Sequence, residues 1–238
     1  MKPFLFAAIG LASVFLLRPV PTLADGMVPE TSVVIVHEAD GETSIRVRND
    51  DDRAALLLVT IQDIPEDDEP LVFLTQPAWR VEAGQEQVVR FILRDDVPLQ
   101  GQRLKRVVFE GVPELSPGGD SVTKVGVTIR QNLPLLIHPR GLDLDRTPWT
   151  QLVWSLDAGQ LRVTNPSLHV VRLAQDVVLL PSGKNVSLPR SYLLPGQSLL
   201  ASSDHLARSD VQRVRIFPAT VYGFAVGAFE TTLQPSEH

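Results

Sequence analysis

The stretch VTKVGVTIRQNLPLLIHP, residues 122–139, carries the clearest strand pattern in the chain. Val125, Val127 and Ile129 alternate with polar or small residues, so they share one face of a strand while their neighbours share the other. Apolar residues continue to Ile137, which predicts a strand longer than one small sheet usually needs. Most long strands of this kind are core. The alternative is that part of the apolar row is kept for a strand of another protein.

The N-terminal segment has the composition of a secretory signal. Lys2 gives residues 1–3 a positive charge, residues 4–17 are apolar, and the small residues up to Ala24 fit signal peptidase cleavage before Asp25. A membrane anchor is the alternative, but a span needs about 20 apolar residues. Arg18 interrupts the apolar run before that length is reached. We therefore expect cleavage after Ala24 and export of the mature chain to the periplasm.

Composition limits the structure and chemistry of the mature chain. The 238 residues, less the signal, suffice for two domains of about 100 residues each. A content of 44% hydrophobic residues can form a core, and 19 Pro with 15 Gly is typical of an all-β protein. The absence of Cys excludes disulfides, thiol chemistry and Cys-ligated metal. The formal net charge of -6 argues against nucleic acid as a partner.

Both halves of the chain show short strand patterns separated by turns. About seven strands precede Pro139, with no helical periodicity, which is the pattern of an immunoglobulin-like sandwich. The clearest candidates are residues 32–36, 43–48, 56–61, 87–93, 104–109 and the long strand. Residues 139–148 lose the alternation and predict a linker, and further short strands beyond them predict a second β-sandwich. We therefore divide the chain into a signal peptide at 1–24, a first domain at 25–140 and a second domain at 141–238.

Five short motifs occur one after another along the chain. They are QVVR at 87–90, the long strand ending in HP at 138–139, LRVTNPS at 161–167, LPGQ at 194–197 and VYG at 221–223. With these motifs the sequence resembles the periplasmic pilus-assembly chaperones of the PapD-like family over nearly the whole mature chain. The resemblance implies an all-β fold of two immunoglobulin-like domains at an angle, with a cleft between them. It also implies donor-strand complementation, in which the chaperone lends a strand to a pilus or fimbrial subunit and delivers it to an outer-membrane usher.

The apolar row of the long strand has the properties that this mechanism needs. A subunit that lacks one strand exposes a sheet edge and an apolar groove, both prone to aggregation. A lent strand pairs with the edge through its main chain, and Val125, Val127 and Ile129 have the spacing to fill the groove. Full burial at roughly 1.5 to 3 kcal/mol per side chain gives about 5 to 9 kcal/mol before the cost of association. We therefore expect these three residues to form the subunit-binding strand.

One feature departs from the family pattern. Many members hold the C-terminal carboxylate of the subunit with an Arg in the first strand and a Lys near the end of the long strand. Ser32 and Pro134 occupy those positions in this chain. Either the chain holds its subunit differently, or a nearby base such as Arg130 substitutes; the other interpretation of Arg130 is a solvated charge at a strand end.

No residues in the sequence point to an enzyme. The histidines His37, His138, His169 and His205 are too scattered for a metal site, and no nucleophile elbow, phosphate loop or dinucleotide motif is present. We therefore expect no catalytic residue, no metal and no cofactor. Besides the assembly chaperone, the sequence leaves open an exported adhesive or structural module built of two β-sandwiches. It also leaves open whether the free chain self-associates by covering its own exposed strand.

Overall fold

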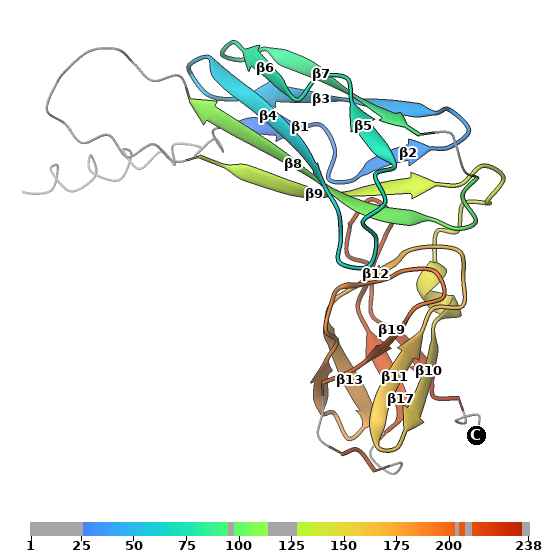
Figure 1. Ribbon diagram of the computed structural model, residues 1–238. Coiled ribbons are helices and arrows are strands. Elements are labelled where there is room, and N and C mark those ends of the chain that lie inside the picture. Colours follow the sequence, from blue (N-terminus) through green and yellow to red (C-terminus); the bar gives the residue numbers. More distant parts are fainter. Residues whose placement is uncertain (1–25, 95–97, 114–127, 203–204, 208–210, 235–238) are drawn as a thin grey trace, which may run out of the picture.

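The computed structural model describes residues 26–94, 98–113, 128–202, 205–207 and 211–234, which form two β-domains set at an angle (Figure 1). The first domain contains strands β1 to β9, and the second contains the remaining strands with one short 3-10 helix, η1. This confirms the expected all-β fold with two immunoglobulin-like domains. No helix in the described ranges is long and apolar enough to cross a membrane.

The first domain is a sandwich of two sheets. One sheet has the strand order β1-β3-β7-β5, and the other has the order β2-β9-β8-β4-β6. The strands are β1 (Met27–Pro29), β2 (Val34–His37), β3 (Glu42–Asn49), β4 (Ala55–Gln62), β5 (Val72–Leu74), β6 (Ala78–Val81), β7 (Glu86–Leu93), β8 (Arg103–Pro113) and β9 (Arg130–His138). Side chains of both sheets meet in one core, in which Phe91 and Phe109 are fully buried.

The first strand of this domain differs from the prediction. The strand expected at residues 32–36 forms as β2, but an additional strand that was not predicted, β1, precedes it in the other sheet. β1 pairs antiparallel with β3, whereas β2 pairs parallel with β9. The pattern of residues 32–36 predicted a strand but not the change of sheet before it, because each short strand satisfies its backbone against a different distant partner.

The second domain contains three smaller sheets around a core of its own, in which Trp154 is fully buried. The 3-10 helix η1 (Pro148–Gln151) begins where the predicted linker ends. The strands are β10 (Val153–Asp157), β11 (Gln160–Thr164), β12 (Val171–Leu173), β13 (Asp176–Pro181), β14 (Asn185–Ser187), β15 (Tyr192–Leu193), β16 (Ser198–Leu200), β17 (Val211–Ile216), β18 (Pro218–Ala219) and β19 (Phe229–Thr232).

Two of the sequence motifs in the second domain form one buried hydrogen-bond network. Asn165 is fully buried, and its amide nitrogen donates to the carbonyl oxygens of His169 at 2.7 Å and Leu194 at 3.1 Å. Its amide oxygen accepts from the hydroxyl of Ser167 at 2.7 Å. Gly196, with a φ of +71°, turns the LPGQ segment back so that its N–H donates to the Asn165 carbonyl at 2.8 Å. The Asn-Pro-Ser and Leu-Pro-Gly motifs are therefore parts of a single structural unit.

We expect Asn165→Leu to destabilise the second domain, because it leaves several buried backbone groups without partners. Each orphaned group costs about 1 to 3 kcal/mol, so a loss of roughly 3 kcal/mol in the free energy of unfolding is expected. Urea unfolding followed by tryptophan fluorescence measures this loss. Asn185→Leu, at an exposed position on β14, serves as the control and should change stability little. Equal stability of the two variants would contradict the structural role of Asn165.

Candidate functional site

One edge of β9 is only partly covered. On one side β9 pairs with β8 from Arg130 to Ile137, whereas on the other side β2 pairs with it from Leu135 to His138 only. Within the described ranges, residues 130–134 therefore have no strand partner on the β2 side, and we call this segment the free edge. An open edge presents unpaired backbone groups to which another chain can add a strand.

The apolar row of the long strand changes its environment along its length. Leu135 and Ile137 are fully buried in the core of the first domain, and Leu133 packs against that core. At the other end Ile129 is 42% exposed, beside Gly26, the residue before β1. The half of the row beyond Leu133 is thus core, as is usual for a long strand, but Ile129 is not. Val125 and Val127 lie outside the described residues.

Arg130, the base that the sequence suggested as a carboxylate anchor, already has an acidic partner. It pairs with Glu110 on β8 with an N–O distance of 3.1 Å, and its side chain is 59% exposed. Exposed ion pairs of this kind contribute about 0 to 1 kcal/mol to stability. This weak, exposed ion pair is compatible both with a carboxylate anchor and with a solvated charge at a strand end.

Ser32 and Pro134, which stand in place of the family's basic pair, lie at the inner end of the free edge. Pro134 is buried on β9, immediately before the residues that β2 covers. The hydroxyl of Ser32 donates to the carbonyl oxygen of Tyr222 at 2.7 Å, which joins the first domain to the second. Neither side chain carries charge, so these two positions contribute no cation to the site.

Two arginines bring positive charge to the same region. Arg106 on β8 lies opposite Pro134, and Arg172 on β12 approaches from the second domain. Burial, and secondly the charge of Arg106, lower the pKa of Arg172 below its ordinary value. Burial also lowers the pKa of Arg106. Sequence inspection did not single out either residue, because an Arg in a strand gives no sign of whether its charge will be paired.

The domains meet through an apolar cluster and a buried amide. Gln102 is 2% exposed; its amide nitrogen lies 2.9 Å from Nδ1 of His138, and its amide oxygen accepts from the backbone N–H of Val170 at 2.8 Å. The backbone N–H of Gln102 donates to the carbonyl of Leu168 at 2.8 Å. Apolar residues of both domains surround these bonds, including Val33, Leu104, Leu136 and Val170. The relative position of the two domains is therefore held by buried contacts.

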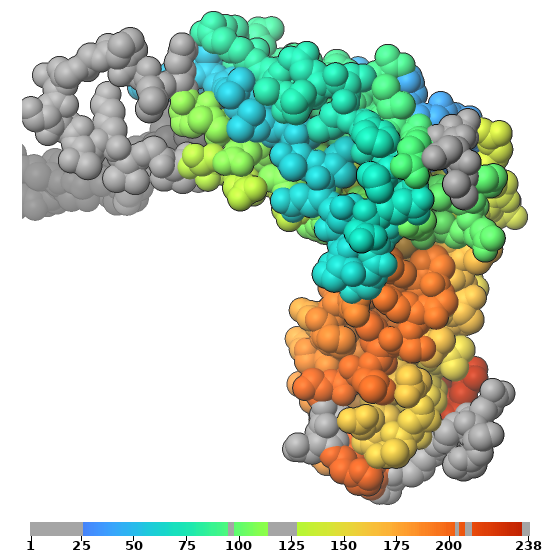
Figure 2. Space-filling model, in the orientation of Figure 1, coloured from blue at the N-terminus to red at the C-terminus, as the bar shows by residue number. Residues whose placement is uncertain are grey.

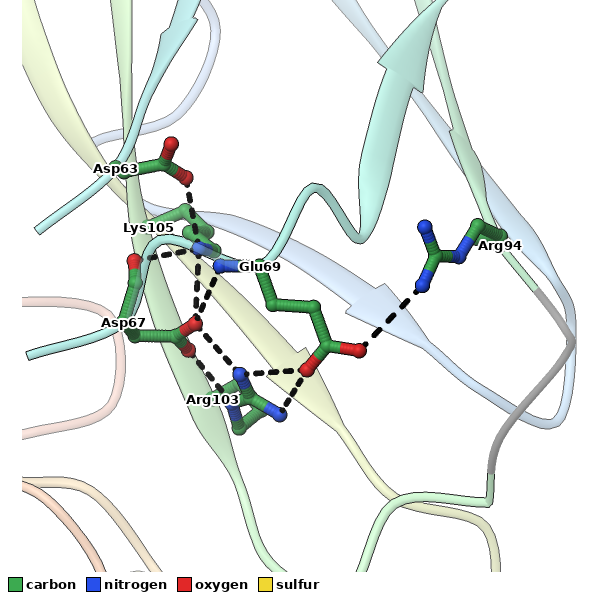
Figure 3. Close-up of polar contacts among 6 residues, drawn as sticks. All are labelled: Asp63, Asp67, Glu69, Arg94, Arg103 and Lys105. Atoms are coloured by element: carbon green, nitrogen blue, oxygen red, sulfur yellow. Dashed lines mark hydrogen bonds and ion pairs between the residues drawn. The ribbon is translucent and has the colours of Figure 1, made fainter.

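A cluster of charges fixes the loop between β4 and β5 (Figure 3). Lys105 is fully buried, and its ammonium donates to Asp63 at 2.7 Å and to the carboxylate of Asp67 at 3.0 Å. Arg103 donates to both carboxylate oxygens of Asp67 and also to Glu69. Every charge drawn in Figure 3 thus has an opposite partner, which a buried ammonium requires.

The loop that this cluster holds rests on the second domain, as the space-filling view shows (Figure 2). Its Glu66 accepts a hydrogen bond from the hydroxyl of Tyr192 at 2.8 Å and forms an ion pair with Arg190. The loop that the charge cluster holds therefore contacts the second domain through Glu66.

Two of the histidines that are scattered in the sequence lie side by side in the structure. β2 and β9 bring His37 and His138 side by side, with ring centroids 5.3 Å apart, although they are distant in sequence. His138 is engaged at both ring nitrogens, by Gln102 and by the carbonyl oxygen of Leu142. In the described ranges no group of three or more potential metal ligands is found.

A cavity of about 380 Å³ lies beside these histidines, between the first domain and the loop after β18. Its lining is mostly apolar and includes Ile35, Leu136, Leu144, Tyr222 and Phe224. Tyr222 is 55% and Phe224 is 68% exposed. The cleft implied between the two domains is therefore present in the structure.

The fold and the site define a two-domain immunoglobulin-like protein in which one sheet edge near the domain junction is open. A family model described as pili and flagellar-assembly chaperone, PapD N-terminal domain, matches residues 26–143. The uncharacterized fimbrial chaperone YhcA of Escherichia coli (strain K12) is 44% identical over 223 residues, which cover 93% of this chain and 97% of the relative. The chain therefore belongs to the family of pilus and fimbrial assembly chaperones, which are periplasmic proteins.

Solved structures share the fold at lower identity. A chain from the complex of Salmonella enterica SafA pilin with the SafB chaperone has a TM-score of 0.70 at 19% identity, covering 89% of this chain and 98% of that chain. The E. coli chaperone DraB has a TM-score of 0.69 at 19% identity, covering 88% of this chain and 99% of that chain. These similarities extend over both domains.

We expect Asp67→Asn to weaken the charge cluster and change how stability depends on pH. Burial alone would raise the pKa of the Asp67 carboxyl, but hydrogen bonds from Arg103 and Lys105, and the charges of both, lower it overall. A lowered pKa stabilises the folded chain above the ordinary Asp value of about 4, and that stability is lost as the pH falls through the folded pKa. The variant should lose about 3 kcal/mol at pH 7 and show a flatter decline on acidification.

Urea unfolding at a series of pH values between neutral and acid measures both effects. Asp176→Asn, at an exposed position on β13, is the matched control and should follow the wild-type profile. A variant at position 67 with the wild-type profile would show that the cluster does not stabilise the fold.

Proposed function

We propose that this chain binds an incomplete pilus or fimbrial subunit by lending it a strand that begins with Val125, Val127 and Ile129 and continues into β9. The observation that carries this proposal is the free edge, where residues 130–134 pair with β8 only among the residues that the structure describes. Ile129, exposed at the outer end of a row whose inner end is core, supports it further. The edge supplies main-chain hydrogen bonds, and the row supplies side chains for the apolar groove of the subunit.

The similar proteins support subunits as the partners. The SafB chaperone was solved with SafA pilin, and the Acinetobacter baumannii chaperone CsuC was solved with the tip adhesion subunit CsuE. By analogy with its family, we propose that this chain passes its subunit to an outer-membrane usher. Before it meets a subunit, the free chain can cover its own edge by self-association.

Export and the limits of the domains are further parts of the proposal. We place a signal peptide at residues 1–24, a first domain at 25–140 and a second at 141–238. The boundary after residue 140 agrees with the end of β9 at His138 and the start of η1 at Pro148. The periplasmic location of the family supports cleavage and release.

Co-expression of the chain with a candidate pilin tests the proposed function. Rescue of the pilin from degradation, with co-purification of the two proteins, is the expected result. Binding to a surface glycan or protein without any pilin would instead support the alternative, an exported adhesive or structural module.

Val127→Asp should abolish co-purification of the subunit and leave the melting temperature of the chaperone unchanged. An unpaired charge in an apolar groove costs several kcal/mol, which is enough to remove binding. Val88→Asp, at a 53% exposed position on β7 in the other sheet, is the control and should retain the subunit. If the row faces the chaperone's own core, Val127→Asp should unfold the chaperone instead. A Val127→Asp protein that melts normally and recovers the subunit at wild-type yield would refute binding through this face.

The mature protein should begin at Asp25 and should be insensitive to reductant, because the chain contains no Cys. Intact mass spectrometry of the periplasmic fraction, with and without dithiothreitol, measures both properties. A membrane-bound product that retains residues 1–17 would overturn the assignment of a cleaved signal.

A further inference from the structure

Two buried histidines, one from each domain, bind the segment that links the domains. His138, at the end of β9, is 7% exposed, and its Nε2 lies 2.8 Å from the carbonyl oxygen of Leu142. His169, just before β12 in the second domain, is 8% exposed, and its Nε2 lies 2.9 Å from the carbonyl oxygen of Asp143. Consecutive residues of the linker are therefore held by histidines of different domains.

The hydrogen bonds around His138 fit only one neutral form of its ring. A carbonyl oxygen cannot donate, so Nε2 carries the hydrogen that it donates to Leu142. The amide oxygen of Gln102 accepts from the backbone N–H of Val170, so the amide group that faces Nδ1 of His138 is the NH2. Nδ1 must then accept the hydrogen bond from Gln102 and carry no hydrogen.

A proton on Nδ1 is incompatible with the link that Gln102 makes between the domains. Both atoms of the contact between Gln102 and His138 would then be donors. If the amide turns over to offer its oxygen to His138, its NH2 faces the N–H of Val170 instead. In either orientation a hydrogen bond is lost at Gln102, which is only 2% exposed, so water does not readily replace it.

The cationic neighbours of His138 also oppose a positive charge on its ring. The ring of His37 on β2 lies with its centroid 5.3 Å away, and Arg146 of the linker lines the same cavity. The guanidinium of Arg140 lies close by, where it donates to the carbonyl oxygen of Glu38 at 3.4 Å. The residues that line the cavity include no Asp or Glu.

Three acidic residues lie on the segments around the ring, and each is exposed or engaged elsewhere. The carboxylate of Glu38 accepts from the backbone N–H groups of Leu99 at 3.1 Å and Arg140 at 2.7 Å. Asp145 accepts hydrogen bonds from residues that follow it, and Asp143 is exposed. From the second domain, the loop after β18 contributes only uncharged residues to the cavity. Among the described residues, none of these carboxylates is paired with the ring.

His169 should respond to acid in the same direction as His138. Its Nε2 donates to the carbonyl of Asp143, and its Nδ1 is buried without a hydrogen-bond partner among the described residues. A proton on Nδ1 would therefore be a buried donor that has no acceptor in the described chain. The neutral forms of both rings are thus the ones that hold the linker.

We propose that His138 is a pH switch of the domain junction. The neutral ring keeps Gln102 bonded to Val170 and so locks the two domains together, whereas the protonated ring breaks this bridge and loosens the linker. His169 adds to the response. The inference goes beyond the proposed function, because it concerns the junction and not the free edge.

The sign of the pH dependence follows from the difference between the folded and unfolded chains. A His in an unfolded chain gains its proton at about pH 6.5, whereas His138 in the folded chain gains one only by losing the Gln102 bridge. The unfolded state therefore binds more protons in this range. The stability that the bridge contributes is present above this pH and declines as the pH falls through it.

Gln102→Glu tests the switch, because a carboxylate can serve both partners of a protonated ring. One oxygen would accept from the N–H of Val170 and the other from the protonated Nδ1 of His138. Melting temperatures of the mature chain and of the variant are compared at about pH 7.5 and about pH 5.5, on either side of the ordinary His range. The variant should lose less on acidification than the wild type. A difference between the two proteins that is the same at both pH values overturns the proposal.

Hydrogen exchange at the Val170 N–H locates the change at the junction and needs no variant. After correction for the intrinsic pH dependence of exchange, this N–H should lose at least tenfold of its protection between about pH 7.5 and about pH 5.5. The N–H of Leu179, which donates to the carbonyl of Lys184 within the second domain, should keep its protection. Unchanged protection of Val170 overturns the proposal.

Histidine variants and the state of the ring complete the test. His37→Gln removes the exposed neighbour of His138 and should leave the pH dependence at Val170 as in the wild type. Loss of that dependence in His37→Gln would assign the switch to His37 instead. If Gln102→Glu does not fold, nitrogen NMR of the wild-type rings still decides, since His138 should carry hydrogen on Nε2 only at about pH 7.5. A hydrogen on Nδ1 at that pH refutes the proposed switch.

Discussion

The unequal pairing of β9 is the constraint on which the site depends. β8 covers this strand along nearly its whole length, but β2 covers only its last four residues, from Leu135 to His138. The short length of β2 follows from the change of sheet between β1 and β2. If one long first strand paired with β9 throughout, the edge would be closed and Ile129 would have a partner from its own chain. The core of the first domain is therefore complete, whereas among the described residues its β2-β9-β8-β4-β6 sheet keeps an open edge along residues 130–134.

The junction between the domains places a second set of groups at the end of this edge. Gln102 and the apolar cluster around it join the domains with satisfied hydrogen bonds, and Glu66 holds a loop of the first domain to the second. These contacts bring Arg172 of the second domain to the strand end of the first. If the same two domains met at a different angle, the free edge would remain, but Arg172 would not lie at its end.

The buried ammonium of Lys105 and the partly buried guanidinium of Arg172 differ in whether they have partners. Lys105 has carboxylate and carbonyl partners, so its burial adds to the rigidity of the loop that touches the second domain. Arg172 has no partner in the described chain, and its pKa is lowered by burial and by Arg106. A protein selected only for stability would pair or lose such a charge.

The sequence by itself determined the class of fold and much of the local structure. Alternation of apolar residues predicted most of the main strands of the first domain, such as β3, β4 and β7, because side chains on a strand alternate between core and solvent. The order of the Asn-Pro-Ser, Leu-Pro-Gly and Tyr-Gly motifs indicated the family, and the structure explains the first two as one network around Asn165. Membership in the chaperone family agrees with that interpretation.

Other features were decided only by the tertiary structure. The apolar row of residues 122–137 did not reveal where core ends and exposed strand begins, because that depends on how far β2 extends along β9. The absence of a base at Ser32 and Pro134 was visible in the sequence, but the approach of Arg106 and Arg172 to the same region was not. Whether a charge is paired depends on which distant side chains reach it, and here those side chains belong to two domains whose angle is set by buried contacts.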